Sequence, residues 1–196
     1  MRLHKFASDA EYLDCQRHRR RQRDPSVSIN EVLRICDWLQ THGVSPRCRG
    51  ICHGASLGNE VRLFRDTLPN SEVIGTDLIP LGSDVIEWDF RKPKPEWIGR
   101  FDFVYSNSLD HVRDPKATVK TWLGQVKPSG VVLVCWSRGH MVPSEFEMPR
   151  PGGDCFEARL DEYILMMERI GVIRDLIYCK TKVKPGRMVI VVGKQR

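Results

Sequence analysis

The sequence has no long apolar run. No stretch of it approaches the roughly 20 consecutive apolar residues that a membrane-spanning helix needs. The first residues, MRLHKFASDAEY, also lack the apolar core of a secretory signal peptide. These two absences argue against a helical membrane protein and against a secreted one, and they predict a cytoplasmic protein.

The sequence also lacks the paired cysteines of a disulfide-stabilised domain. Its seven cysteines are an odd number and are spread over predicted strands and helices. One local cluster, CRGICH, contains Cys48, Cys52 and His53, but the second cysteine pair of a structural zinc site is missing. Cys52 also falls on a predicted buried strand, where free thiols are common. We therefore predict buried thiols and no metal site.

The composition is that of one ordinary folded domain. Hydrophobic residues make up 41% and charged residues 29% of the 196 residues, which suits one substantial core. The formal net charge is +6, and much of it lies in the run RHRRRQR at 17–23. Such a run can bind nucleic acid, but it has no interleaved aromatic residues. A solvated helix face is the preferred interpretation, and RNA binding stays open.

The chain alternates predicted strands with predicted helices. A helix capped by Ser28 or Asn30 comes first and ends at Gly43. Its predicted core stripe is Ile29, Val32, Leu33, Ile35, Cys36 and Leu39. Strands are then predicted at 49–52, 72–77, 84–89, 101–106, 130–136, 172–179 and 187–193, and helices at 59–68, 115–126 and 159–170. This order predicts an α/β domain whose mostly parallel sheet has helices on both faces. Because no helix separates the last two strands, one of them is expected to be antiparallel at the sheet edge.

Four short motifs fall where predicted strands end, which is where an open α/β sheet binds its ligands. In the first, HGASLGNE at 53–60, Gly54 and Gly58 allow a tight turn before a helix N-terminus with free amides. Asp77 ends the second strand at about the offset, roughly 20 residues, where an acidic residue accepts hydrogen bonds from ribose hydroxyls. These two motifs together favour a nucleotide-type ligand.

The other two motifs end the third and fourth strands. Asp89 can receive the exocyclic amine of adenine, and Phe90 can pack on its ring. SNSLDH at 106–111 offers small polar residues and His111, which titrates near neutral pH and can act as a base. Each of these motifs also fits a local turn or cap when it is considered alone.

In their order, the motifs resemble those of class I S-adenosylmethionine-dependent methyltransferases. HGASLGNE, GTDL, EWDF, FDFVYSNSLDHVRDP and KPSGVVLV follow one another over about 49–137. The chain is most similar to small, methyltransferase type 11-like members, whose fourth strand ends in a small polar residue and a Leu-acidic-His triplet. The resemblance implies a Rossmann-like, doubly wound sheet of about seven strands with an antiparallel edge strand. It implies one domain over 1–196, with a helical segment at 1–45, a cofactor core at 49–137 and a lid or acceptor loop at 138–158.

The resemblance also implies S-adenosylmethionine as the cofactor and assigns it contacts. The glycine motif would line its methionine and ribose side, Asp77 would bind the ribose hydroxyls, and Leu78 would flank the adenine. Asp89 and Phe90 would hold the adenine, and the Ser-Asn pair at 106–107 would lie near the methionine. The implied contact residues are His53, Gly54, Ala55, Gly58, Glu60, Asp77, Leu78, Asp89, Phe90, Ser106 and Asn107.

Two residues depart from the family pattern. Cys52 stands where the glycine motif usually begins with an acidic residue, and Ser56 replaces its middle glycine. In the family, that acidic residue helps to hold the amino group of the methionine. Glu60, on the first turn of the next helix, is a candidate substitute for the missing carboxylate.

The sequence therefore predicts a metal-independent enzyme that moves a methyl group to a small-molecule or sugar-like acceptor. The protein mainly has to align this acceptor, and a hydroxyl or ammonium acceptor also needs a base. His111 and His140 are the candidates, and His140 lies in the long loop after the fifth strand, whose length favours a lid.

Three alternatives stay open. The first is an RNA methyltransferase, or a non-enzymatic nucleic-acid-binding protein, that uses the run 17–23. The second is an NAD-dependent oxidoreductase, although HGASLG does not match GxGxxG and no Tyr-x-x-x-Lys pair is visible. The third is a protein that keeps the fold but has lost the activity, given Cys52 and Ser56.

Overall fold

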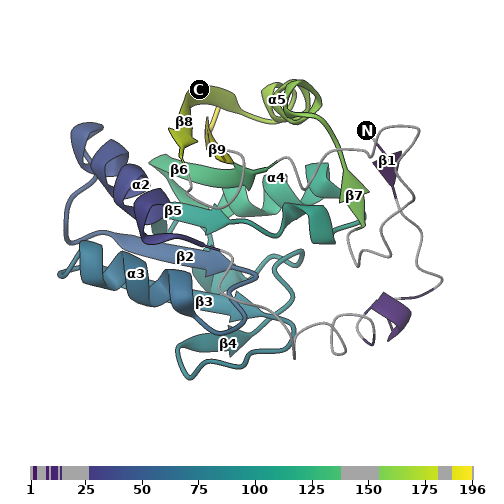
Figure 1. Cartoon of the computed structure of the whole chain (residues 1–196), viewed down its shortest axis with the longest axis horizontal. Coiled ribbons are helices and arrows are strands. Elements are labelled where there is room, and N and C mark those ends of the chain that lie inside the picture. Colours follow the sequence, from purple (N-terminus) through teal and green to yellow (C-terminus); the bar gives the residue numbers. More distant parts are fainter. Residues whose placement is uncertain are drawn as a thin grey trace.

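A seven-stranded sheet forms the centre of the computed structural model of the chain (Figure 1). The structure describes residues 27–137, 155–180 and 187–195, together with 8, 10–12, 14 and the backbone of 2–3. The basic run 17–23, His140 and the lid positions 138–154 lie outside the described residues. In chain order the elements are β1 Arg2–Leu3, α2 Ile29–Thr41, β2 Arg49–His53, α3 Asn59–Thr67, β3 Glu72–Asp77, β4 Val85–Glu87, η1 Pro95–Trp97, β5 Phe101–Ser106, η2 Leu109–His111, α4 Pro115–Gln125, β6 Val126–Trp136, β7 Phe156–Glu157, α5 Leu160–Glu168, β8 Val172–Cys179 and β9 Arg187–Gly193.

The strand order in the large sheet is β4-β3-β2-β5-β6-β9-β8. The five strands from β4 to β6 are parallel to one another. β9 runs antiparallel to both of its neighbours, β6 and β8, and β8 forms the edge. The predicted fold class, a mostly parallel α/β sheet with antiparallel pairing at one edge, is confirmed.

Helices cover both faces of this sheet. α2 and α3 lie side by side on one face, whereas α4 and α5 pack against the other (Figure 1). The apolar run of β6 serves both layers, because neighbouring residues of a strand point to opposite faces. Leu133 belongs to the core under α2 and α3, and Val132 and Val134 belong to the core under α4 and α5. The apolar run of β6 is therefore continuous along the strand and does not alternate with polar residues.

Helix α2 begins as predicted and buries most of the predicted apolar stripe. Ser28 is the N-cap, and its Oγ accepts a hydrogen bond from the backbone N–H of Glu31. Ile29 and Leu33, predicted as core residues, are 48% and 46% exposed, while Glu31 is fully buried. The other four residues of the predicted stripe are buried as expected, so the prediction was wrong only at Ile29 and Leu33. A buried carboxylate such as that of Glu31 is tolerated only where other groups pair with it.

The partners of Glu31 come from two strands. Tyr105 on β5 donates a 2.7 Å hydrogen bond from its hydroxyl to Oε1, and Arg187 on β9 forms a 3.0 Å ion pair from Nη1 to Oε2. Burial and the negative charge of Glu31 raise the pKa of the Tyr105 hydroxyl well above its usual value. The three side chains tie α2 to the middle of the sheet and to its antiparallel edge.

The connections on either side of β4 have no α-helix. Residues 78–84 alone join the parallel strands β3 and β4, where a crossover of about a dozen or more residues is usual. The next connection contains only the single turn η1. Ile86 on β4 and Ile98 after η1 are 41% and 60% exposed. The short 78–84 connection begins at the carboxyl edge of the parallel strands, where the predicted motifs lie.

β7 pairs antiparallel with β1, so part of the predicted 138–158 loop is a short strand.

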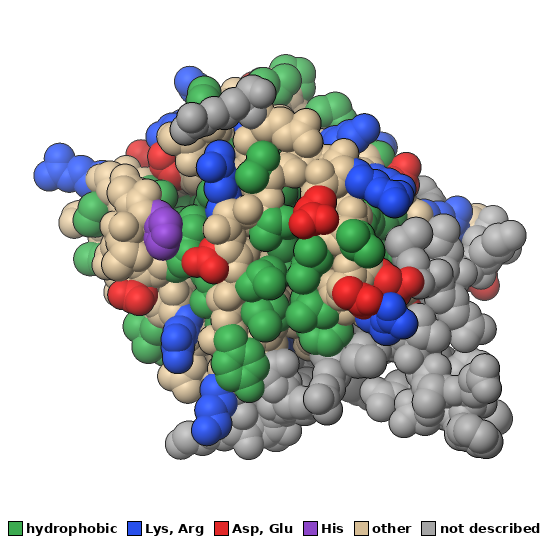
Figure 2. All heavy atoms as spheres, turned by 90° about the horizontal axis from the view of Figure 1, so that it is seen from above, with side chains coloured by type: hydrophobic (Ala, Val, Ile, Leu, Met, Phe, Trp, Pro, Cys, Tyr) green, Lys and Arg blue, Asp and Glu red, His purple; other side chains and the backbone are tan. Residues whose placement is uncertain are grey.

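On the opposite side from β4, Val172, Leu176 and Tyr178 of the edge strand β8 are exposed, and Figure 2 shows hydrophobic side chains gathered on this side of the molecule. Among the described residues, every helix is too short or too polar to cross a membrane.

Candidate active site

The turns that follow β2, β3, β4 and β5 lie along one edge of the sheet. The strands are parallel and in register there, since His53 lies beside both Thr76 and Ser106, and Asp77 lies beside Glu87. The four motifs predicted from strand ends are therefore brought together at the carboxyl edge.

The turn from β2 into α3 has three residues in the left-handed region. Gly54, Ser56 and Gly58 have φ of 77°, 43° and 74°. A Cβ on Gly54 would lie 2.5 Å from Oγ of Ser108, so the turn packs closely on the segment after β5. Gly58 is the N-cap of α3 and offers no side-chain cap, which leaves the first amides of the helix for another acceptor. Ser56 keeps the backbone conformation that a glycine would adopt there.

Asp77 holds this glycine turn to the connection 78–84. Its Oδ2 accepts a 3.0 Å hydrogen bond from the amide of Ser56, and its Oδ1 accepts a 2.8 Å bond from the amide of Ile79. The carbonyl of Ser56 in turn accepts bonds from the amides of Leu81 and Gly82. Asp77 is only 2% exposed. The carboxylate thus stands at the junction of two backbone turns at the end of β3.

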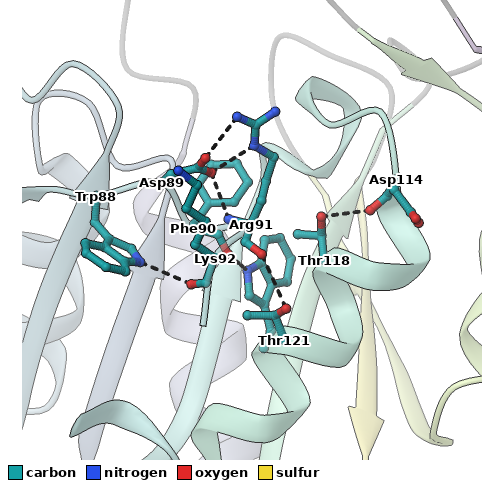
Figure 3. Close-up of polar contacts among 9 residues, drawn as sticks. Trp88, Asp89, Phe90, Arg91, Lys92, Asp114, Thr118 and Thr121 are labelled. Atoms are coloured by element: carbon teal, nitrogen blue, oxygen red, sulfur yellow. Dashed lines mark hydrogen bonds and ion pairs between the residues drawn. The ribbon is translucent and has the colours of Figure 1, made fainter. Parts of the chain in front are cut away.

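Asp89, after β4, is paired with Arg91 (Figure 3). Nε and Nη2 of Arg91 donate to Oδ1 and Oδ2 of Asp89 at 2.8 and 2.9 Å. Burial alone would raise the pKa of Asp89, but the hydrogen bonds and charge of Arg91 hold it below its usual value. Asp89 is therefore an ionised carboxylate that Arg91 orients at the edge of the sheet.

Phe90 occupies the core rather than the edge. Its ring is 7% exposed and packs edge-on against Trp122, and its carbonyl accepts a 3.0 Å bond from the Trp122 indole (Figure 3). The rings of His53 and Trp122 pack beside it, and the expected contact of Phe90 with the adenine stays a prediction. These contacts also fix the backbone that carries Asp89 and Arg91.

His53 points into the same core. It is fully buried, and its Nδ1 and Nε2 lie 2.7 Å from Thr76 Oγ1 and 2.8 Å from Gln125 Oε1. Burial lowers its pKa to about 4, although the hydrogen bond to Gln125 opposes this shift. The imidazole is thus a neutral core group beside Phe90 and Trp122, and a cofactor contact by residue His53 stays a prediction.

The end of β5 is built from small polar side chains. Buried Ser106 donates from Oγ to the carbonyl of His53 at 3.0 Å and accepts a bond from the amide of Ser108. Ser108, which the sequence motif did not single out, donates to Oδ1 of Asn107 and faces Gly54. Its position next to a glycine of another motif is visible only in the fold.

His111 ends the single turn η2 that follows. Its Nε2 lies 3.9 Å from Oδ2 of Asp110, and the two side chains are 14% and 7% exposed. The backbone carbonyl of Asp110 accepts a 2.7 Å bond from Cys155, just before β7. The candidate base is therefore mostly enclosed, beside a carboxylate that sequence reasoning missed.

Glu60 lies in the first turn of α3, behind the glycine turn. It is 6% exposed. Burial raises its pKa to about 7, and the charges of Asp77 and Glu31 add to the shift. After burial, the charge of Glu60 is the largest influence that raises the pKa of the Cys52 thiol. The carboxylate of Glu60 therefore lies near the position where the resembling family carries its acidic residue.

The predicted cofactor residues thus fall into two groups. Gly54, Leu78, Asp89 and Asn107 are partly exposed at the edge, whereas the other predicted side chains are buried. Among the described cysteines all are free and buried, and in the described ranges no group of three or more His, Cys, Asp or Glu residues is placed to hold a metal ion. His140 belongs to the segment that the structure does not describe.

Comparison with known proteins identifies the architecture. No protein-family model matches the sequence, and no curated protein matches it either. Among solved structures, the 1,6-didemethyltoxoflavin-N1-methyltransferase of Burkholderia thailandensis matches with a TM-score of 0.71 at 15% identity, over 98% of this chain and 93% of that one. A TehB-like S-adenosylmethionine-dependent methyltransferase of Corynebacterium glutamicum gives 0.60 at 13% identity, over 96% of this chain and all of that one (100%).

Another similar structure is the CMeT domain of the citrinin polyketide synthase. Its TM-score is 0.54 at 12% identity over 76% of this chain, and the match spans only 47% of the domain structure. At identities this low, the similarity shows the fold alone. The resemblance inferred from the motifs is confirmed at this level, and the chain has the fold of class I S-adenosylmethionine-dependent methyltransferases.

Proposed function

We propose that this protein is an S-adenosylmethionine-dependent methyltransferase that acts on a small-molecule or sugar-like acceptor. One observation carries the proposal: the glycine turn, with left-handed backbone at Gly54, Ser56 and Gly58, is hydrogen bonded to the carboxylate of Asp77. In a fold of this class, that junction is at the strand ends where a nucleotide ligand binds.

The chemistry of these residues fits the adenosyl part of the cofactor. The positive φ of Gly54 and Gly58 shapes the turn that leads into α3, and α3 presents amides without a side-chain cap. The amides of Ser56 and Ile79 hold the carboxylate of Asp77 at the end of β3, where an acidic residue can bind a ribose hydroxyl. Asp89, ionised and oriented by Arg91, is suited to accept the exocyclic amine of adenine, with the partly exposed Leu78 flanking the ring.

The methionine part would be held by the end of β5 and by Glu60. Asn107 presents a partly exposed amide at this edge, while Ser106 and Ala55 form the buried support beneath it. Glu60 supplies the carboxylate that Cys52 lacks, and an ammonium group placed beside it would favour its ionised form. The two departures from the family pattern are thereby compensated by neighbouring groups.

The remaining task of the chain is to receive the acceptor and remove its proton. Bound S-adenosylmethionine supplies a methyl group that its sulfonium already activates. His111, enclosed beside Asp110, is the candidate base among the described residues, and His140 is the second candidate. The Burkholderia thailandensis enzyme, whose structure holds 1,6-didemethyltoxoflavin and S-adenosylhomocysteine, supports a small-molecule acceptor.

Isothermal titration calorimetry with S-adenosylhomocysteine, S-adenosylmethionine and NAD tests this function. The proposal expects saturable binding of both adenosyl ligands, weakened in Asp77→Ala and unchanged in Asp66→Ala, an exposed aspartate on α3. Absence of adenosyl binding in the folded wild type would sink the proposal, and binding of NAD instead would favour an oxidoreductase.

A second titration tests whether Glu60 binds the ammonium group of the cofactor. Since burial raises its pKa to about 7, adding S-adenosylmethionine at pH 7 should release protons if the ammonium group binds there. Buffers with different ionisation enthalpies measure this release directly. Glu60→Gln should abolish the release, and an unchanged release in that variant would exclude Glu60 from the methionine site.

A further inference from the structure

A cavity that is open to solvent lies at the opposite edge of the sheet from the candidate active site. It has a volume of about 640 Å³. Its walls come from the end of α2, the start of β6, the start of β8 and the residues after β9, all at the amino edge of the parallel strands. The side chains that matter for its chemistry are Trp38, His42, Ser129, Arg174, Lys194 and Gln195.

The charges in this cavity have one sign. Arg174 and Lys194 are cationic, and His42 becomes cationic when protonated. Ser129 and Gln195 add neutral hydrogen-bonding groups. Among the described residues that line the cavity, none is acidic. A guanidinium fork and an ammonium group in one cavity are suited to a phosphate or a similar anion.

The backbone of β8 directs the side chain of Arg174 toward the cavity. The pairing of β8 with β9 shifts register between Ile173 and Asp175, so Arg174 lies at a bulge. Bulges re-aim side chains and are common next to binding sites. A Cβ on Gly193 would lie 2.5 Å from Nε of Arg174, so this side chain lies directly against the backbone at the end of β9. A larger residue at 193 would displace it.

The opposite wall is an ordered pair of rings. Trp38 and His42 stack with their ring centroids 4.0 Å apart and an angle of 13° between the planes. The indole N–H of Trp38 donates a 2.7 Å bond to Asp175 Oδ2, and Oδ1 of Asp175 accepts the amide of Leu176. The nearby carboxylate of Asp175 is therefore engaged in fixing the wall.

We propose that this cavity binds a small organic phosphate, with Arg174 and Lys194 on the phosphate group. The volume lies within the range of about 300–1,000 Å³ that is usual for small-molecule sites and leaves room for an organic body beside the rings. The proposal does not depend on the methyltransferase function, because the two sites occupy opposite edges of the sheet.

Calorimetric titration with uridine 5′-monophosphate tests the proposal, with uridine and inorganic phosphate as comparison ligands. The nucleotide should bind saturably with 1:1 stoichiometry, more tightly than inorganic phosphate, while uridine should not bind. Arg174→Gln and Lys194→Gln should each weaken binding by about tenfold, the effect of losing a hydrogen bond to a charged group. Lys116→Gln, which removes an exposed charge on α4, should leave binding unchanged.

Several results would overturn the proposal. These are the absence of binding at millimolar nucleotide, equal binding in both cavity variants and wild type, or inorganic phosphate binding as tightly as the nucleotide. Displacement of the nucleotide by S-adenosylhomocysteine would assign it to the carboxyl edge and also overturn the proposal. Circular dichroism of each variant shows whether lost binding reflects lost folding.

Discussion

The amide of Ser56 donates a 3.0 Å hydrogen bond to Oδ2 of Asp77. The bond joins the residue that departs from the family's glycine pattern to the acidic residue expected to bind ribose. It forms because Ser56 adopts a φ of 43°, a backbone conformation that residues other than glycine rarely adopt. The turn has thus kept its shape although its middle glycine is missing, and the strain at Ser56 can be measured.

Ser56→Gly should leave the free energy of unfolding unchanged or raise it slightly. Relief of the left-handed strain is worth roughly 1 kcal/mol, and the greater flexibility of glycine in the unfolded chain offsets about 0.5–1 kcal/mol of it. Ser56→Val should be clearly destabilising, because a β-branched residue tolerates this conformation poorly. Urea unfolding of the three proteins gives the comparison, and a marked loss of stability in Ser56→Gly would contradict it.

Gly54→Ala should cost more stability than Gly43→Ala. Both glycines have positive φ, 77° and 83°, but a Cβ at 43 has open space and a Cβ at 54 meets Ser108. We expect a loss of about 1–2 kcal/mol at 43 from backbone strain, and about 1–3 kcal/mol more at 54 from overpacking. Only Gly54→Ala should weaken binding of S-adenosylhomocysteine. Adding Ser108→Gly to Gly54→Ala should recover part of the stability, and no recovery would rule out the steric cause.

His53 and Glu60 should have opposite effects on the pH dependence of stability. Burial lowers the pKa of His53 from 6.5 to about 4 and raises that of Glu60 from 4.5 to about 7. Between pH 4.5 and 6.5 the unfolded chain binds a proton at His53, whereas the folded chain binds one at Glu60. The proton counts are equal, so these two groups together leave the free energy of unfolding nearly independent of pH in this window.

Single substitutions should reveal the two opposing pH dependences of the free energy of unfolding. With Glu60→Gln, the remaining His53 makes stability rise as the pH increases from about 4 to 6.5, by on the order of 3 kcal/mol. With His53→Gln, the remaining Glu60 makes stability fall as the pH increases from about 4.5 to 7 by a similar amount. Urea titrations at several pH values, taken relative to wild type, measure both slopes. Parallel curves for the two variants would refute the assignment.

The buried pair of Glu31 and Arg187 should be strongly coupled. Breaking a buried ion pair from one side typically costs about 3–5 kcal/mol, because it leaves a charge without its partner. We expect Arg187→Met to lose about that much and the double variant Glu31→Leu/Arg187→Met to lose less than the sum of the single variants. A double-mutant cycle in urea supplies the coupling energy. Additive losses would mean that Tyr105, rather than Arg187, is the partner that stabilises the carboxylate.

His111→Gln should reduce methyl transfer without affecting the cofactor. A base acting on the acceptor contributes about 10²–10⁴-fold to the rate, so kcat should fall by at least the lower figure. Binding of S-adenosylhomocysteine should be unchanged, because His111 lies on η2 and not in the glycine turn. Asp66→Ala, the exposed aspartate on α3, is the control in assays with an identified acceptor. A kcat equal to wild type would transfer the role to His140 or to an acceptor that needs no base.

The sequence alone determined the order of the elements and the positions of the turns. Alternating apolar patterns, the cap at Ser28, the glycines at 54 and 58 and the acidic ends at 77 and 89 are local signals, and local hydrogen bonding enforces them. They were sufficient to predict the parallel sheet and the edge at which the candidate site lies, because parallel strands bring their carboxyl ends together.

Only the tertiary structure decided which way the side chains at those positions face. Glu31 is buried because Tyr105 and Arg187, far away in the chain, pair with it, and Phe90 is anchored in the core by Trp122. His53 follows its strand's alternation onto the face covered by α4, where it packs beside Trp122. No local pattern contains this information, since the burial of a polar group depends on partners that only folding brings within hydrogen-bond distance.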